Sequence, residues 1–193
     1  MEDLSGLSSK LTVERATYAV LRFAAPTTVP GETFATGFVR LLDHALIEYE
    51  LARTRLEEAQ TTRHLSARLR TQAHLETCIW AMHRALSFLE RLRKCGFYLG
   101  DGTPLVPRSR GLEVLRRDAR GRIRNLRHAV EHVEKDVISG KTDPRGPITL
   151  KLEQTGVSLG GAEVTFVELA RWLRQMHEVA ERLNTCGPVE SAK

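Results

Sequence analysis

The sequence predicts a mostly α-helical fold, in which an antiparallel helical bundle is followed by a small β-hairpin and a final helix. Apolar residues recur at three- and four-residue steps over three long stretches, and strand-like alternation begins only after residue 141. Of 193 residues, 41% are hydrophobic and 27% charged, which is typical of one globular domain. We therefore expect an N-terminal segment (1–31), a helical core (32–140) and a β-hairpin plus C-terminal helix packed on the core (141–193).

The N-terminal segment contains a stretch, 11–23, that fits either a short helix or a strand. Prolines and a glycine between residues 25 and 31 then break the chain, and Thr28 or Thr33 could cap the helix that follows. That first long helix is expected over 32–60, with a mixed-charge outer face typical of a solvated surface. Its inward positions are Phe34, Phe38, Leu41, Leu42, Ala45, Tyr49 and Leu56.

A second long helix is predicted over 63–95, because Lys94 and Gly96 supply the basic last turn and the glycine stop that helix ends favour. Trp80 and Phe88 widen its apolar stripe. The stripe itself comprises Leu65, Leu69, Leu75, Ile79, Met82, Leu86, Leu89 and Leu92. Residues 96–111 follow as a glycine- and proline-containing loop, which is longer than most connections require.

A third helix is predicted over 112–139, and the chain changes character after it. Its buried side comprises Leu112, Leu115, Ala119, Ile123, Leu126, Val130, Val133 and Val137. Residues 148–152 alternate like a strand, and 157–166 around Gly160-Gly161 complete a small hairpin or meander. The final helix is expected over 167–184, with Leu169, Trp172, Leu173, Met176 and Val179 facing inward.

The composition excludes several classes of protein. No apolar run approaches the roughly 20 residues of a membrane span, and the first residues lack the basic start and apolar block of a secretory signal. Three cysteines without a CxxC pair argue against a disulfide framework or a zinc site, so a reducing cytoplasm is expected. The net charge of +5 favours contact with polyanions such as RNA.

The stretch from residue 124 to 135 concentrates polar groups beside a buried helix face. Arg124, His128 and His132 are spaced i, i+4, i+8 and share one stripe of the third helix. Arg127 and Glu131 form the neighbouring row, where they could be an ordinary i, i+4 ion pair. A cleft or a contact between subunits could form along this edge.

This stretch resembles the signature of the HEPN family, which is an arginine, often followed by Asn, Asp or His, and then a histidine after four to six residues. Arg127 and His132 match it with four residues between them and His128 in second place. Two long antiparallel helices before the motif helix also resemble the HEPN arrangement, over residues 32–140. Arg122 with His128 fits the spacing with an apolar second residue, and Arg124-Asn125 has the favoured dipeptide without a suitably placed histidine, so Arg127 and His132 are preferred.

The resemblance implies a HEPN-like bundle and a metal-independent endoribonuclease that acts as a homodimer with a composite Arg/His site. Arg127 would hold the scissile phosphate and His132 would act as acid or base, because arginine stays charged and histidine titrates near neutrality. Arg124, Asn125 and His128 would bind substrate, with no cofactor and no metal. A toxin role would bring an antitoxin-like protein partner.

Two alternatives remain open. Many members of the family keep the fold without catalysis, so the chain could be a dimerisation module or a nucleotide- or RNA-binding module. A nucleic-acid-binding regulator is the third class, although the sequence offers no recognition-helix unit and only 6% aromatic residues for base stacking. The remaining histidines lie on separate predicted helices, and no HExxH or Cys/His cluster predicts a metal site.

Overall fold

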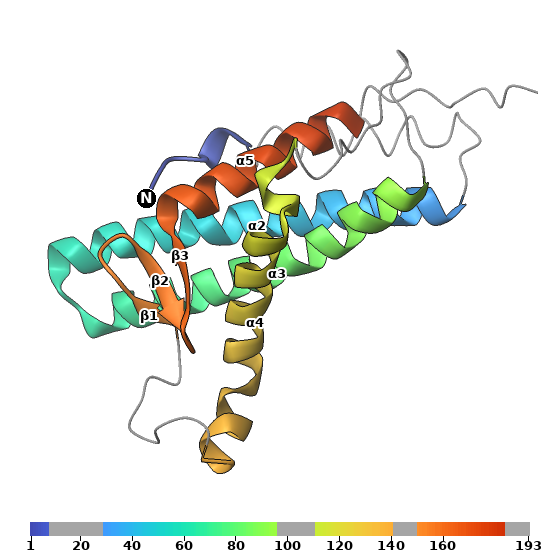
Figure 1. The fold of residues 1–193 in the computed structure, drawn as a ribbon. Coiled ribbons are helices and arrows are strands. Elements are labelled where there is room, and N and C mark those ends of the chain that lie inside the picture. The colour runs from blue at the N-terminus through green and yellow to red at the C-terminus, as the bar shows by residue number, and fades with distance from the viewer. Residues whose placement is uncertain (8–28, 96–110, 141–149, 184–193) are drawn as a thin grey trace, which may run out of the picture.

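The computed structural model describes residues 1–7, 29–95, 111–140 and 150–183, and most of these are helical. The predicted short element at 11–23 and the loop at 96–110 lie outside the described residues. Helices α2 (Val29–Thr62) and α3 (Leu65–Cys95) form a long antiparallel hairpin, which is the largest feature of the molecule (Figure 1). Both helices were predicted, with ends within three residues of those observed.

The turn between α2 and α3 is tight, and Arg63 takes the left-handed conformation there, with φ of 57°. Its amide donates to the carbonyl oxygen of Ala59 at 3.0 Å, so it closes the helix as a C-terminal cap usually does. Glycine is the residue that normally adopts this conformation, because it has no Cβ. The hairpin therefore accepts a modest local strain at its tip.

The hairpin buries one continuous apolar seam, to which α5 adds its own apolar face. Phe38, Leu42 and Tyr49 from α2 meet Ile79, Met82 and others from α3, all at most 2% exposed. The prediction of the stripe is wrong at two positions, since Leu65 and Leu69 are 69% and 52% exposed. Trp80, which was expected to widen the stripe, is 41% exposed, and the guanidinium of Arg84 lies over its ring.

The predicted third helix is interrupted. A short 3-10 helix, η1 (Glu113–Leu115), is followed by extended backbone at Arg116, and α4 (Arg117–Ile138) begins only after it. Contacts with α5 stabilise the interruption, because the Gln175 side chain accepts from the Val114 amide at 3.1 Å. Figure 1 shows α4 crossing α3 steeply and then extending away from the hairpin.

The β-region is a three-stranded antiparallel meander, β1 (Lys151–Leu152), β2 (Gly156–Leu159) and β3 (Ala162–Thr165), in that order. Gly160 and Gly161 turn between β2 and β3 with φ of 59° and 79°, as a hairpin turn of the mirror-image type requires. The sheet contacts α3, α4 and α5. Of the two arrangements that the sequence left open, a small hairpin or a meander, the meander is the one observed.

Helix α5 (Phe166–Leu183) follows directly and lies along α2 (Figure 1). Thr165 and Glu168 form a capping box, in which the Thr165 amide donates to Glu168 and the Glu168 amide donates to the Thr165 hydroxyl oxygen. All five residues predicted to face inward are buried. Within the described ranges, no helix is both long and apolar enough to cross a membrane.

Candidate functional site

Helix α4 is held against the rest of the fold by one apolar face. The residues of this face are at most 1% exposed and follow the predicted three- and four-residue spacing: Ala119, Ile123 and Leu126. The side chains of 133–137 lie outside the description, so the predicted burial of Val133 and Val137 is not seen. The polar residues on either side of this apolar face are therefore fixed in direction by the core beneath them.

A basic cleft of about 410 Å³ lies where α4 crosses the C-terminal half of α3. Its arginines come from both helices: Arg93 from α3, and Arg117, Arg120 and Arg124 from α4. The three from α4 share one face, because they are spaced i, i+3, i+7. The rest of the lining consists of His83, Leu86, Ser87, Leu115 and Gly121.

The four arginines of the cleft are not equivalent. Arg120 is held by Glu90 of α3 through two hydrogen-bonded contacts, with Nη2 and Oε2 2.6 Å apart. Arg93, Arg117 and Arg124 are exposed, and none of them has an ion pair with another described residue. Three of the four guanidinium groups in the cleft, those of Arg93, Arg117 and Arg124, are therefore open to an anion from solvent.

Arg127 lies one turn beyond the cleft, and its guanidinium forms an ion pair with Glu131 on the same helix. Both side chains are about three-quarters buried. The Arg127 Nε is buried and has no hydrogen-bond acceptor within the described part of the chain. The ion pair that the sequence left open as the ordinary interpretation is thus present, and one donor of the guanidinium is still unused.

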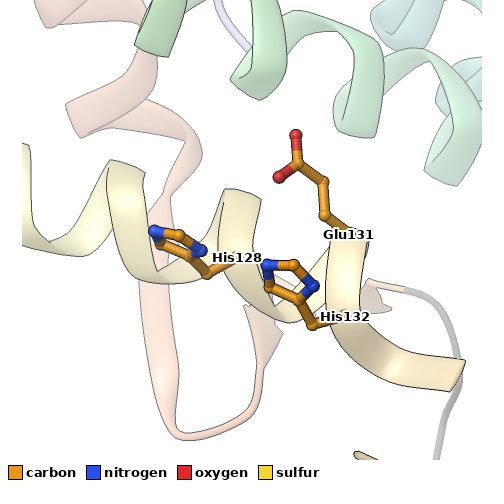
Figure 2. Close-up of side chains that lie close together, drawn as sticks. All are labelled: His128, Glu131 and His132. Atoms are coloured by element: carbon orange, nitrogen blue, oxygen red, sulfur yellow. The ribbon is translucent and has the colours of Figure 1, made fainter. Parts of the chain in front are cut away.

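His128 and His132 lie side by side on successive turns of α4, while the Glu131 side chain points toward α3 (Figure 2). The two imidazole rings are stacked, with centroids 5.5 Å apart and planes 21° apart. Both residues are exposed. They can therefore reach a ligand in solvent without any change in the core.

His83 faces this region from α3. Its Nδ1 is buried and has no hydrogen-bond partner among the described residues. Burial lowers the pKa of His83, and the positive charges of Arg127 and His128 lower it further. A neutral imidazole on the wall of an arginine-lined cleft can accept a proton or a hydrogen bond from a bound molecule.

Only some of the site residues predicted from the sequence line the cleft. Arg124 lines the cleft, whereas Asn125 is exposed and lies outside its lining. Arg127 and His132 are five residues apart, so they project from the helix about 140° from one another. Both nevertheless lie beside Glu131, because Arg127 pairs with its carboxylate and one carboxylate oxygen lies within 4.8 Å of a His132 nitrogen.

Two parts of the site were not predicted from the sequence. The first is the contribution of α3, since Arg93 and His83 join the α4 arginines only through the crossing of the two helices. The second is the set His128, Glu131 and His132, whose nitrogen and oxygen donor atoms lie within 4.8 Å of one another. The sequence pattern that could have identified this set is two histidines at i and i+4 with a glutamate between them.

Comparison with protein-family models, with curated proteins and with solved structures finds no match to this chain. Inferences about its function therefore come from its own residues.

Proposed function

We propose that the protein binds RNA in the α3–α4 cleft and cleaves it as a metal-independent endoribonuclease of the HEPN type, acting as a homodimer. The observation that carries this proposal is the arginine-lined cleft, which continues along α4 into the histidine stripe. From Arg117 to His128 the helix rises about 16 Å. A single strand laid along this line would place phosphates on the arginines and a ribose near the histidines.

The exposed arginines of the cleft would be the first residues to bind phosphate. Arg93, Arg117 and Arg124 offer guanidinium forks that match phosphate oxygens in a bidentate way. Arg127 would join them by exchanging the carboxylate of Glu131 for a phosphate, since the two anions present similar oxygens to the guanidinium. In this proposal a scissile phosphate would take the place of the Glu131 carboxylate on Arg127.

The chemistry requires an acid and a base. A neutral imidazole takes the proton of the ribose 2′-hydroxyl, and the 2′-oxygen forms a bond to phosphorus while the bond from phosphorus to the 5′-oxygen breaks. A protonated imidazole gives its proton to the leaving 5′-oxygen, so the products are a 2′,3′-cyclic phosphate and a 5′-hydroxyl. We propose that His132 acts as the acid or base in these proton transfers and that His128 binds substrate. Arg127 would stabilise the negative charge that develops on the phosphate.

The HEPN resemblance is the reason for proposing a homodimer. A second copy facing α4 would bring its own Arg127 and His132 opposite those of the first, which gives the composite Arg/His site that the resemblance implies. In this proposal the protein acts in the cytoplasm, where RNA is abundant. An antitoxin-like protein partner would act by covering the cleft.

A noncatalytic RNA- or nucleotide-binding module is the second candidate. The Arg127–Glu131 ion pair favours this candidate, because Glu131 already neutralises the guanidinium that catalysis would use to stabilise charge on the phosphate. In this case the cleft would bind phosphates and the histidines would only contribute to the surface.

The test is incubation of total RNA with wild-type protein in EDTA, in parallel with Arg127→Ala/His132→Ala. His64→Ala/Arg68→Ala is the matched control, because it removes the same two residue types from exposed positions at the opposite end of the hairpin. Cleavage by wild type and control alone, with 2′,3′-cyclic ends, supports the ribonuclease. Cleavage retained by the Arg127/His132 variant refutes the assigned residues.

The oligomeric state is tested separately by light scattering on the purified protein at micromolar concentration. A dimer is expected, and a monomer that nevertheless cleaves RNA would contradict the composite site. RNA binding without cleavage by any folded variant would instead favour the noncatalytic module.

A further inference from the structure

The donor atoms gathered by His128, Glu131 and His132 suggest a second property of α4. Each residue offers one atom, an imidazole nitrogen or a carboxylate oxygen, and all three atoms lie within 4.8 Å of one another. Figure 2 shows the two imidazole rings side by side, with Glu131 next to them on the same helix. We propose that these three residues form a binding site for a transition-metal dication of the zinc and copper class.

The kind of donor decides the kind of metal. Two imidazoles and one carboxylate suit Zn²⁺ and Cu²⁺, whereas Mg²⁺ and Ca²⁺ require sites made almost wholly of oxygen ligands. Two histidines one helical turn apart are held in register by the backbone, so the helix itself brings the first two ligands together. The Irving–Williams order then places Cu²⁺ above Zn²⁺ in affinity.

The observed geometry is close to what coordination needs. In a tetrahedral site with zinc–ligand bonds of about 2.0 Å, neighbouring ligand atoms are about 3.3 Å apart, somewhat less than the 4.8 Å limit seen here. His128 and His132 are exposed, so their rings can rotate inward without disturbing the core. Three protein ligands leave a fourth position open to water or to a phosphate oxygen.

Arg127 is the competitor for one of these ligands, because it is paired with Glu131. Metal binding would draw a carboxylate oxygen toward the histidines and release the guanidinium toward the cleft. The metal site and the arginine-lined cleft are thereby linked through a single glutamate.

A regulatory consequence follows, and it rests on the proposed ribonuclease function. A metal ion on His132 occupies the nitrogen that proton transfer requires, so Zn²⁺ should inhibit cleavage and EDTA should restore it. The metal site itself is independent of this consequence, because its ligands and its measurement involve no RNA.

The experiment is calorimetric titration of the full chain with Zn²⁺ in a non-coordinating buffer. We expect one equivalent to bind with micromolar affinity, weakened about tenfold or more in His128→Ala/His132→Ala. His64→Ala, which removes another exposed histidine, should bind as wild type does. Electron paramagnetic resonance of the Cu²⁺ form should show coupling to two imidazole nitrogens, lost in the double variant.

Equal Zn²⁺ affinity of the wild type and the double variant would overturn the proposal, because the ion would then occupy other ligands. Absence of binding to the wild type would overturn it as well. RNA cleavage assayed in EDTA and then with added Zn²⁺ separates the two proposals. Failure to cleave in EDTA counts against the ribonuclease alone, whereas equal affinity in the titration counts against the metal site alone.

Discussion

Replacing Glu131 by glutamine should strengthen the dependence of RNA binding on salt. The wild-type cleft offers Arg93, Arg117 and Arg124 to phosphates, while Arg120 is neutralised by Glu90 and Arg127 by Glu131. Each phosphate contact to a single strand contributes about −0.7 to the slope of log K against log salt, so three contacts give a slope of about −2. Glu131→Gln releases a fourth arginine and should change the slope to about −3.

The assay is fluorescence anisotropy with a 2′-O-methyl oligonucleotide, which cannot be cleaved through its 2′-oxygen. EDTA is present throughout, so that metal ions do not contribute. The ionic strength is varied over about a decade and the slope is fitted for each variant. Urea unfolding of each variant checks that the fold is retained, because this partly buried ion pair can contribute more than the about 0.3–0.5 kcal/mol of an exposed i, i+4 pair.

The matched control is Glu58→Gln. It removes the carboxylate that pairs with Arg55 on α2, and both variants raise the net charge equally. Because Arg55 does not line the cleft, the control should keep the wild-type slope. Equal slopes for Glu131→Gln and wild type, or a comparable change in Glu58→Gln, would refute the assignment of Arg127 to the phosphate path.

Three further predictions concern the elements that position the site. Leu126→Ala removes a fully buried side chain from the α4 face and should cost about 2–5 kcal/mol, seen as a lower urea midpoint at unchanged slope. Gly156→Ala would force a Cβ onto the backbone of the adjacent strand, so we expect a lower melting temperature, equivalent to about 1–3 kcal/mol. Burial opposes ionisation of Glu168, yet hydrogen bonds from Thr165 and Arg122 leave its pKa lowered. The stabilisation from Glu168 is therefore present above the unfolded-state pKa and lost as pH falls through the folded value, so Glu168→Gln should be less stable than wild type at pH 7 and equal to it in acid, by urea unfolding.

The long helices could be predicted because their apolar spacing reports directly on burial. α5 illustrates this, since each of its predicted inward residues is buried. Leu65 and Leu69 show the limit of the method, because periodicity identifies the apolar face of a helix without saying whether another element covers it. They lie beside the α2–α3 turn, where the described helices leave them exposed.

The interruption at Arg116 could not be predicted, because the groups that stabilise it are distant in sequence. Glu113 accepts hydrogen bonds from Arg171 and Trp172, and Val114 donates to Gln175. Each of these contacts joins residues about sixty positions apart. The periodic pattern of 112–139 continues through the interruption, since Leu112 and Leu115 are buried in the 3-10 turn as they would be in a helix.

The candidate site combines a local pattern with a tertiary one. The stripe of Arg124, His128 and His132 follows from helical spacing alone, and the Arg127–Glu131 pair follows from the same rule. The cleft requires α4 to cross α3 at the level of Arg93, which no local pattern specifies. The residues proposed for phosphate binding and proton transfer could therefore be chosen from the sequence. Where an anion can approach them depends on how α4 crosses α3, which only the structure shows.

Glu131 connects the proposals made for this protein, because its carboxylate pairs with Arg127 and also offers a donor atom near His128 and His132. Paired with Arg127, it neutralises the charge that would hold a phosphate; drawn to a metal ion with His128 and His132, it releases that charge. A metal ion would then favour binding of RNA while it blocks the histidine that cleavage requires. Binding and turnover should consequently respond to Zn²⁺ in opposite directions, which a simple loss of folding or a nonspecific effect of the ion would not produce.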